Sequence, residues 1–409
     1  MYKRKSDSIL YFVLVAMSVF FLINRLMIID MAIIGFLFIC KVGEILKADG
    51  LVRTIIAIVA LTACQYIYAV VPQLSVYFSS GEATKEIERA ILYILILALI
   101  RQIELDIRAY QRLWRIILTI VVGICYLQYL KIFNIDSILR NFYGNSVQFY
   151  NSAQTSLALF RGGSVFINPN VLACFLVAYL GNYLSLLDIK KESKIYRIIT
   201  YALVVSGLIL AGSRTGLVVS AIEIMIYYLY IAKNAEKTKI VKLLISVIFI
   251  FAIICLLSAQ SSESSVTTLR AFQVRQGVDN SLSIKFVNFV NVLREGNVLN
   301  YLFGYGPIDY ASNSKLLIDF EIGYFVVFYG LFGVVFYIQM IRNIIRYGEW
   351  NKNYAFQRKR NIMFILIMLL FGFTAGIYLN IRIFAIYLVM FFTSVCDFEE
   401  LDNEEIYSL

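Results

Sequence analysis

The chain has 409 residues, of which 60% are hydrophobic and 16% are charged, whereas a typical soluble domain has about 45–50% and about 25%. This composition excludes an ordinary soluble protein and predicts a membrane protein with many spans. The sequence contains no histidine, which excludes histidine-based metal sites, triads and proton relays, and the net charge of +10 fits residues flanking spans better than a nucleic-acid surface. The six cysteines lie in or beside apolar runs without a CxxC spacing, so we expect buried small residues rather than disulfides or a zinc site.

Apolar runs recur along the whole chain and predict an all-α, polytopic helix bundle over residues 1–409. A membrane-spanning helix needs about 20 apolar residues. The chain has 12 such runs, and two of them are short. The expected number of spans is therefore about 12, within a range of 10–12. The basic start, Met1 to Lys5, has no cleavage site after its apolar run, which favours an uncleaved first span. The runs lie at roughly 9–23, 27–46, 54–72, 87–100, 113–134, 169–187, 196–211, 215–232, 240–258, 318–341, 361–379 and 382–396.

The basic residues predict the orientation of these spans. If the N-terminus is cytoplasmic, 24 of the 37 basic residues fall in cytoplasmic segments, as the positive-inside rule requires. We therefore expect both termini in the cytoplasm, including an acidic tail at 397–409. Two large segments, 135–167 and 259–317, are then outside, and the second is a loop of roughly 60 residues. All three prolines also fall outside, so irregular backbone and function are expected on that face.

The first outer motif joins Arg161-Gly-Gly to Asn168-Pro169-Asn170. Asparagine followed by proline is typical of a helix start, with an N-cap and proline at the first helical position. A plain helix start, without any ligand, is the structural alternative and explains the pattern by itself. The functional interpretation adds Arg161 beside the positive end of the helix and predicts an anion site that includes Asn168 and Asn170.

The second outer motif is Gly212-Ser213-Arg214-Thr215-Gly216, between two apolar runs with almost no loop. An arginine at such a tight hairpin is costly unless it is paired or functional. A snorkelling interface arginine is the structural alternative. We favour an anion-binding Arg214, with Ser213 in the turn beside the ligand.

The long outer segment supplies further candidates for substrate binding: Arg270, Arg275, Lys285, Tyr305 and Gly306. Residues Ser281 to Asn291 have the pattern of a helix lying on the membrane surface. Solvated loop charge is an equally good explanation for the basic residues.

Carboxylates occur at two informative places. Asp319 and Glu321 open a predicted span, where the helix dipole alone favours negative charge. Two residues apart on a helix, they point in different directions and make a poor joint metal site, but one of them could act as a general base. Glu223 lies in the middle of a predicted span and is either functional or satisfied by a structural partner.

Taken in order, four motifs resemble the O-antigen polymerase and ligase superfamily of bacterial cell-surface polysaccharide assembly. The resemblance covers roughly residues 155–340. Its motifs are Arg161-Gly-Gly with Phe166-x-Asn-Pro-Asn170, Ser213-Arg-Thr-Gly216, Ser281-Leu-x-x-Lys285 with Phe303-Gly-Tyr-Gly306, and Glu321-Ile-Gly-Tyr with Gly330-Leu-Phe-Gly333.

This resemblance implies an integral-membrane glycosyltransferase of GT-C-like fold that needs no metal or cofactor. Its donor would be an oligosaccharide on undecaprenyl diphosphate, used at the outer face of the bacterial plasma membrane to build O-antigen, capsule or exopolysaccharide. Membrane lipids, a flippase and a chain-length regulator are the implied partners, and nucleic acid is not. Arg161 and Arg214 would act on the diphosphate, and Glu321, or else Asp319, would act as the base.

Two departures refine the resemblance. Members of the ligase branch carry a histidine eleven residues before the Gly-x-x-Gly motif, where this chain has Asp319. That difference favours the polymerase branch (Wzy type) over an O-antigen ligase-like transferase. Lys285 stands where the family often has arginine, which keeps the charge but loses the bidentate fork. A flippase or transporter of lipid-linked sugars is the competing class, and it would need more intramembrane charge than Glu223 supplies.

Overall fold

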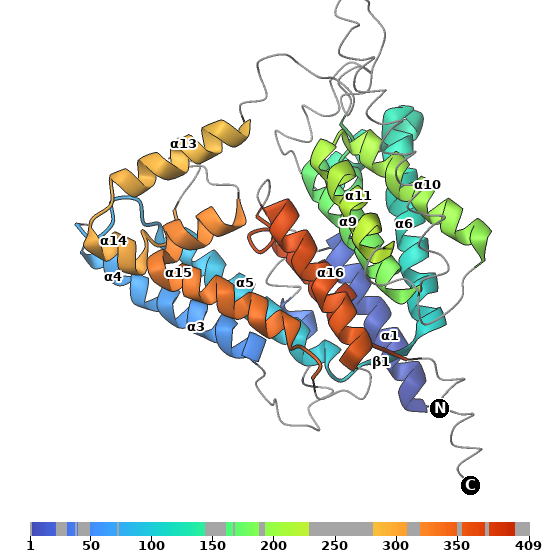
Figure 1. Cartoon of the computed structure of the whole chain (residues 1–409), viewed down its shortest axis with the longest axis horizontal. Coiled ribbons are helices and arrows are strands. Elements are labelled where there is room, and N and C mark those ends of the chain that lie inside the picture. Colours follow the sequence, from blue (N-terminus) through green and yellow to red (C-terminus); the bar gives the residue numbers. More distant parts are fainter. Residues whose placement is uncertain are drawn as a thin grey trace, which may run out of the picture. The chain divides into compact units, whose positions relative to one another are not determined.

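The computed structural model consists mostly of helices (Figure 1). Its chain forms two compact units. Unit 1 comprises Met1–Ile23, Glu104–Val278 and Val395–Leu409, and unit 2 comprises Asn24–Ile103 and Asp279–Ser394. The residues that the structure describes are 2–21, 31–36, 39, 50–71, 73–143, 161–166, 168–187, 193–228, 281–308, 320–349, 354–372 and 376–396.

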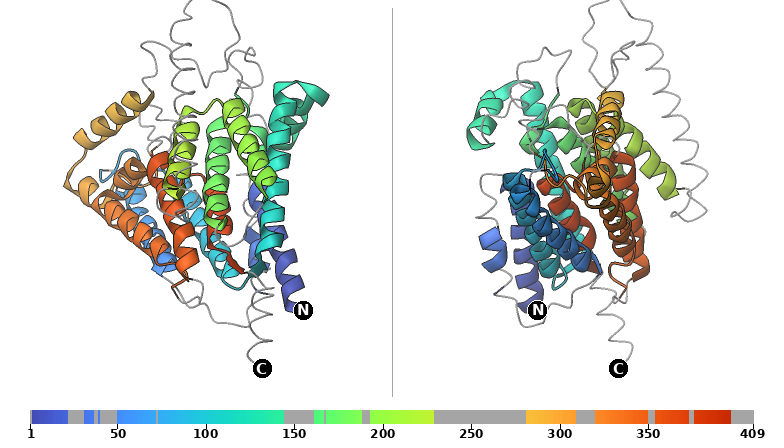
Figure 2. Two further views of the ribbon diagram at one scale, coloured as in Figure 1. Left: turned by 45° about the vertical axis from the view of Figure 1, so that its right-hand side comes forward. Right: turned by 90° about the vertical axis from the view of Figure 1, so that its left-hand side faces the viewer.

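Unit 1 is built around α9 (Pro169–Leu186), which is apolar on all sides and almost entirely buried, as expected for a central helix. Helices α6 (Ile107–Tyr129), α10 (Lys194–Ala211) and α11 (Arg214–Ile226) pack against it (Figure 2). Gly207 of α10 allows a close approach, because a Cβ there would lie 2.9 Å from Leu176 of α9. The other helical elements of this unit are α1 (Tyr2–Ala16), η1 (Met17–Phe21), η2 (Ile132–Asn134), α7 (Ile135–Tyr143) and η4 (Ser164–Phe166). Strand β1 (Glu104–Asp106) pairs with β2 (Ser394–Cys396).

Unit 2 has α17 (Ile381–Phe392) in its core, against α5 (Ser80–Ile100) and α16 (Tyr354–Gly372). The buried Arg360 of α16 donates hydrogen bonds to the carbonyl of Thr393, at 2.6 Å, and to that of Met390. These bonds satisfy backbone acceptors at the end of α17 that have no helical partner. The remaining helices are α3 (Gly50–Gln65), α4 (Ile67–Val70), α13 (Ser281–Arg294), α14 (Val298–Phe303) and α15 (Glu321–Ile345).

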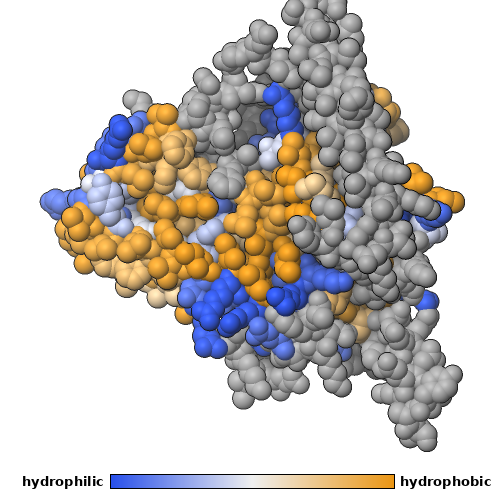
Figure 3. Space-filling view, viewed as in Figure 1, coloured by the Kyte–Doolittle hydropathy of each residue, from blue (hydrophilic) through white to orange (hydrophobic). Residues whose placement is uncertain are grey.

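Within the described part of the chain, five helical segments are long and apolar enough to cross a membrane. Hydrophobic residues also cover most of the described surface over α14, α15 and α16, with hydrophilic residues gathered near helix ends (Figure 3). The prediction of a helical membrane protein is therefore confirmed. The predicted run at 240–258, most of 27–46 and the tail at 397–409 lie outside the described residues. The five segments are Gly50–Val70, Ile107–Tyr129, Pro169–Leu186, Lys194–Ala211 and Glu321–Ile345.

The two large segments between predicted spans contain more helix than their loop-like sequence suggested. Helix α7 lies in 135–167, and α13 and α14 lie in 259–317. The predicted helix from Ser281 to Asn291 is confirmed and extends to Arg294.

Candidate functional site

In unit 1, Arg161 lies beside the start of α9. Its Nη2 donates to Oδ1 of Asn170 at 2.7 Å. Asn168 caps the helix as predicted, because its Oδ1 accepts from the backbone N–H of Asn170 at 2.8 Å and Pro169 is the first helical residue. Local capping thus places a guanidinium group next to the positive end of a helix.

The same arginine also reaches the turn that precedes α11. Arg161 Nε donates to the carbonyl of Ala211 at 3.4 Å, and the next residue, Gly162, donates to Leu210 at 2.9 Å. Gly212 then ends α10 in a left-handed conformation (φ 61°), which suits a residue without a Cβ.

Arg214 is the first residue of α11, directly after that turn. Ser213 caps the helix, because its Oγ accepts from the N–H of Gly216 at 3.1 Å. Both Arg161 and Arg214 are half-buried. The Arg161 guanidinium therefore contacts the start of α9, and Arg214 is the first residue of α11. Positive helix ends and arginines both favour a bound anion.

A short buried segment holds Arg161 in place. Ser164 donates from Oγ to the carbonyl of Val121 at 2.6 Å, and its N–H donates to Oε1 of Gln128 at 2.8 Å. Gln128 in turn donates to Asp136 at 3.0 Å. No sequence pattern predicts this role of Gln128, because glutamine within an apolar run has no characteristic spacing.

In unit 2, the predicted base Glu321 is fully buried at the first position of α15. Its two carboxylate oxygens lie 2.9 and 3.1 Å from the backbone nitrogen of Tyr378, which donates to them. Tyr378 belongs to the turn between α16 and α17. The contact therefore gives Glu321 a structural role, because it anchors this turn to the start of α15. Asp319, the alternative base, lies outside the described residues.

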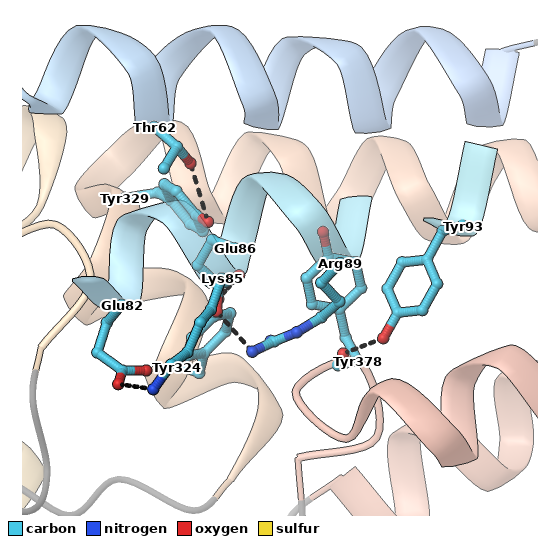
Figure 4. A network of polar contacts seen from close by, with 9 residues as sticks. All are labelled: Thr62, Glu82, Lys85, Glu86, Arg89, Tyr93, Tyr324, Tyr329 and Tyr378. Carbon is cyan, nitrogen blue, oxygen red and sulfur yellow. Dashed lines mark hydrogen bonds and ion pairs between the residues drawn. The ribbon is translucent and has the colours of Figure 1, made fainter. Parts of the chain in front are cut away.

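Next to Glu321 the structure reveals a polar cluster that the sequence did not predict. Arg89 Nη2 lies 2.8 Å from Oε1 of Glu86, one turn earlier on α5. The hydroxyl of Tyr324 donates to Oε2 of Glu86 at 2.6 Å, and Arg89 also interacts electrostatically with Glu321. Figure 4 shows the side chains of Glu86, Arg89 and Tyr324 gathered around α5, together with Tyr93, Tyr329 and Tyr378. The only sequence signal was charge at the start of an apolar run.

Gly304, Tyr305 and Gly306 lie against a break in α15. Gly330 has φ 61° and ψ −141°, which interrupts the helix. The carbonyls of Val327 and Phe328 are freed by this break and accept hydrogen bonds from the N–H groups of Tyr305 at 2.8 Å and Gly306 at 3.1 Å. Irregular backbone in a membrane helix is tolerated where protein groups satisfy it in this way.

Side chains complete this junction. Gln65 of α3 donates from Nε2 to the carbonyls of Phe328 at 2.6 Å and Phe303 at 2.7 Å. Burial raises the pKa of Tyr305 to about 12, and its hydroxyl donates to the carbonyl of Val292 at 2.6 Å. These contacts give Tyr305 and Gly306 a structural role in the packing of unit 2. The substrate-binding role predicted for them is a separate question.

The remaining predicted residues are less informative. Arg270 and Arg275 lie outside the described residues, and Lys285 lies on α13, without a described side chain. Glu223 is fully buried in α11, and among the described residues neither of its oxygens has a hydrogen-bond partner. Among the described residues, no three cysteine, aspartate or glutamate side chains gather as a metal site would require.

No protein-family model and no curated protein matches this chain. Functional assignment therefore depends on the chemistry of these two sites and on the order of the sequence motifs.

Proposed function

We propose that this protein is a glycosyltransferase that polymerises oligosaccharide repeat units carried on undecaprenyl diphosphate. The observation that carries the proposal is the position of Arg161, which hydrogen-bonds Asn170 at the start of α9 and Ala211 in the turn before Arg214. A helical membrane protein with two arginines at two helix starts is suited to bind a lipid-linked diphosphate.

The chemistry requires positive charge at the leaving group. The growing chain passes from its lipid diphosphate to a hydroxyl of the next lipid-linked repeat unit. The C–O bond to the diphosphate breaks, and the negative charge that develops on the phosphate oxygens is stabilised by Arg161, Arg214 and the backbone N–H groups at the helix starts. These groups supply positive charge without requiring a bound metal ion.

The attacking hydroxyl must also lose its proton. Because the chain has no histidine, a carboxylate is the natural acceptor near neutral pH. Glu321 and Asp319 are the carboxylates that the motifs indicate.

The finer parts of the proposal concern topology and setting. They comprise about 12 spans in a GT-C-like arrangement, both termini in the cytoplasm, and catalysis at the outer face of the bacterial plasma membrane. External labelling of single cysteines introduced at Ser262 and Lys239 tests the orientation. The proposal requires that only Ser262→Cys is labelled in intact cells.

Purified protein in liposomes, supplied with defined lipid-linked repeat units, tests the function directly. The expected product is a ladder of polymer, formed without an ion gradient or nucleotide. Arg161→Ala and Arg214→Ala should abolish the ladder, and lysine at either position should restore little because the guanidinium fork is lost. Arg346→Ala is the matched control, since Arg346 is 55% exposed and lies 3.9 Å from Glu349. Normal polymer from both alanine variants would overturn the proposal.

Glu223 favours one competing function. A buried carboxylate without a partner inside a membrane helix is a feature of ion-coupled transporters. A lipid-linked sugar flippase would move its substrate across liposomes in response to an ion gradient and would make no polymer. Loss of that movement in Glu223→Gln would support the transporter instead.

A further inference from the structure

Glu321 and Glu86 are the two acidic residues of the cluster in unit 2, and the partners of their side-chain oxygens differ. Both oxygens of Glu321 face the N–H of Tyr378, and its side chain is 0% exposed. A Cβ on Gly372 would lie 3.1 Å from the Cβ of Glu321, so the backbone of α16 closes over it. Glu321 is therefore held inside the unit by the turn that it stabilises.

Glu86 lies closer to solvent. Its side chain is 5% exposed, that of its partner Arg89 is 13% exposed, and one turn earlier Glu82 and Lys85 are 30% and 61% exposed. Along α5 the polar side chains therefore lead from the surface to the Glu86–Arg89 pair. Glu86 also lies just before the predicted span 87–100, which places it at the membrane boundary rather than within the bilayer.

The pair has spare hydrogen-bonding capacity. Arg89 uses Nη2 for Glu86, whereas its buried Nη1 has no hydrogen-bond partner in the described part of the chain, and neither has the buried hydroxyl of Tyr378. Buried donors without acceptors are rare in folded proteins, and they commonly indicate a missing water or ligand oxygen. A sugar hydroxyl is such an oxygen, because it accepts from a guanidinium N–H while donating to a carboxylate.

The electrostatic setting suits a proton acceptor. Burial raises the pKa of Glu86, against the opposing effects of Arg89 and Tyr324. A general base works best when its pKa is near the working pH. Arg89 and Tyr324 orient the carboxylate, while burial acts against them to raise its pKa.

We propose that Glu86, oriented by Arg89 and Tyr324, accepts the proton of the attacking sugar hydroxyl, while Glu321 holds the α16–α17 turn. This assignment rests on the proposed polymerase function. The acceptor oxygen forms a bond to the anomeric carbon of the donor chain and loses its proton to Glu86. The bond from that carbon to the diphosphate oxygen breaks, and the electron pair leaves with the lipid diphosphate.

Chemical rescue tests the assignment in the liposome assay. Glu86→Gln should lower the polymerisation rate by about 10²–10⁴-fold. Glu86→Ala should be equally slow but regain activity with added formate, which occupies the vacated space as a free carboxylate. Formate should not rescue Glu86→Gln, whose amide fills that space, or Glu321→Ala. Tyr324→Phe removes one hydrogen bond to Glu86 and should cost about 10–100-fold.

The outcomes separate the assignment from the function on which it rests. If the wild type makes polymer and Glu86→Gln makes it at an undiminished rate, the assignment alone is overturned. Rescue of Glu321→Ala but not of Glu86→Ala also overturns it and gives the role to Glu321. No polymer from wild type overturns the proposed function and this assignment with it. Glu86→Gln is nearly isosteric, so it keeps the test decisive if Glu86→Ala does not fold.

Discussion

The arginine site of unit 1 and the carboxylate cluster of unit 2 are built in opposite ways. Arg161 and Arg214 are half-buried residues beside helix starts whose caps involve near neighbours in the sequence, and one longer contact joins Arg161 to Ala211 before α11. Glu86 and Glu321 are buried, and their contacts join α5, α15 and the α16–α17 turn across long stretches of chain. Helix ends are well suited to bind a charged ligand reversibly, whereas buried charge needs a preorganised environment.

The largest expected effect concerns the junction at the α15 break in unit 2. Gly304→Ala places a Cβ 2.3 Å from the backbone of Phe328, at a residue with φ 79°. Strain and overpacking should together cost about 2–6 kcal/mol, which we expect to prevent accumulation of folded protein. Gly123→Ala in α6 is the control, because nothing lies within 4 Å of its Cβ position. Fluorescence-detected size-exclusion chromatography compares the two, and equal yields would contradict the packing described for the break.

Glu321→Gln separates anchoring from catalysis. The substitution replaces one of the two oxygens that accept from the N–H of Tyr378 with an NH2 group, so we expect about 1–3 kcal/mol of lost stability. Thermal unfolding in detergent measures this loss beside the polymerisation rate. Unchanged stability with abolished activity would instead favour Glu321 as the base. Asp319→Asn in the same assay tests the alternative carboxylate and should have the smaller effect.

Removing the Asn170 amide tests how firmly Arg161 must be held. Asn170→Ala leaves the guanidinium without its 2.7 Å acceptor but keeps its charge. We expect polymerisation to fall about 10-fold, consistent with the loss of one charged hydrogen bond. Asn170→Gln keeps an amide acceptor without adding negative charge to the anion site and should recover part of the rate. Equal losses in both variants would show that orientation of Arg161 is not what Asn170 provides.

A smaller effect is expected at Ser164, which positions the backbone that carries Arg161. Ser164→Ala removes the Oγ bond to Val121 and keeps a side chain at φ 49°. We expect about 1 kcal/mol of lost stability. Ser164→Gly loses the same bond but relieves the positive φ, so its unfolding temperature should lie above that of Ser164→Ala. The reverse order would contradict the strained conformation.

The features that could be predicted from the sequence are those fixed by short-range physics. Asn168-Pro169 predicted a helix start correctly, because a cap depends on residues within one turn. The turn predicted at Ser213-Arg214, between two apolar runs, is likewise where α11 begins. The pairing of Glu86 with Tyr324 joins residues 238 positions apart, and no local pattern reports such a contact. Likewise, the sequence shows Gly330 only as part of a Gly-x-x-Gly motif. In the structure Gly330 interrupts α15, and the backbone N–H groups of Tyr305 and Gly306 bind the carbonyls next to the break.

Binding of undecaprenyl diphosphate to purified protein tests the central claim most directly, because it isolates the arginine site from the later chemistry. We predict saturable binding by wild type, weakened about 10–100-fold by Arg161→Ala and by Arg214→Ala, and unchanged in Glu86→Gln. Undecaprenyl alcohol, which lacks the anion, should bind equally weakly to all four proteins. Diphosphate binding that survives the loss of both arginines would contradict the account.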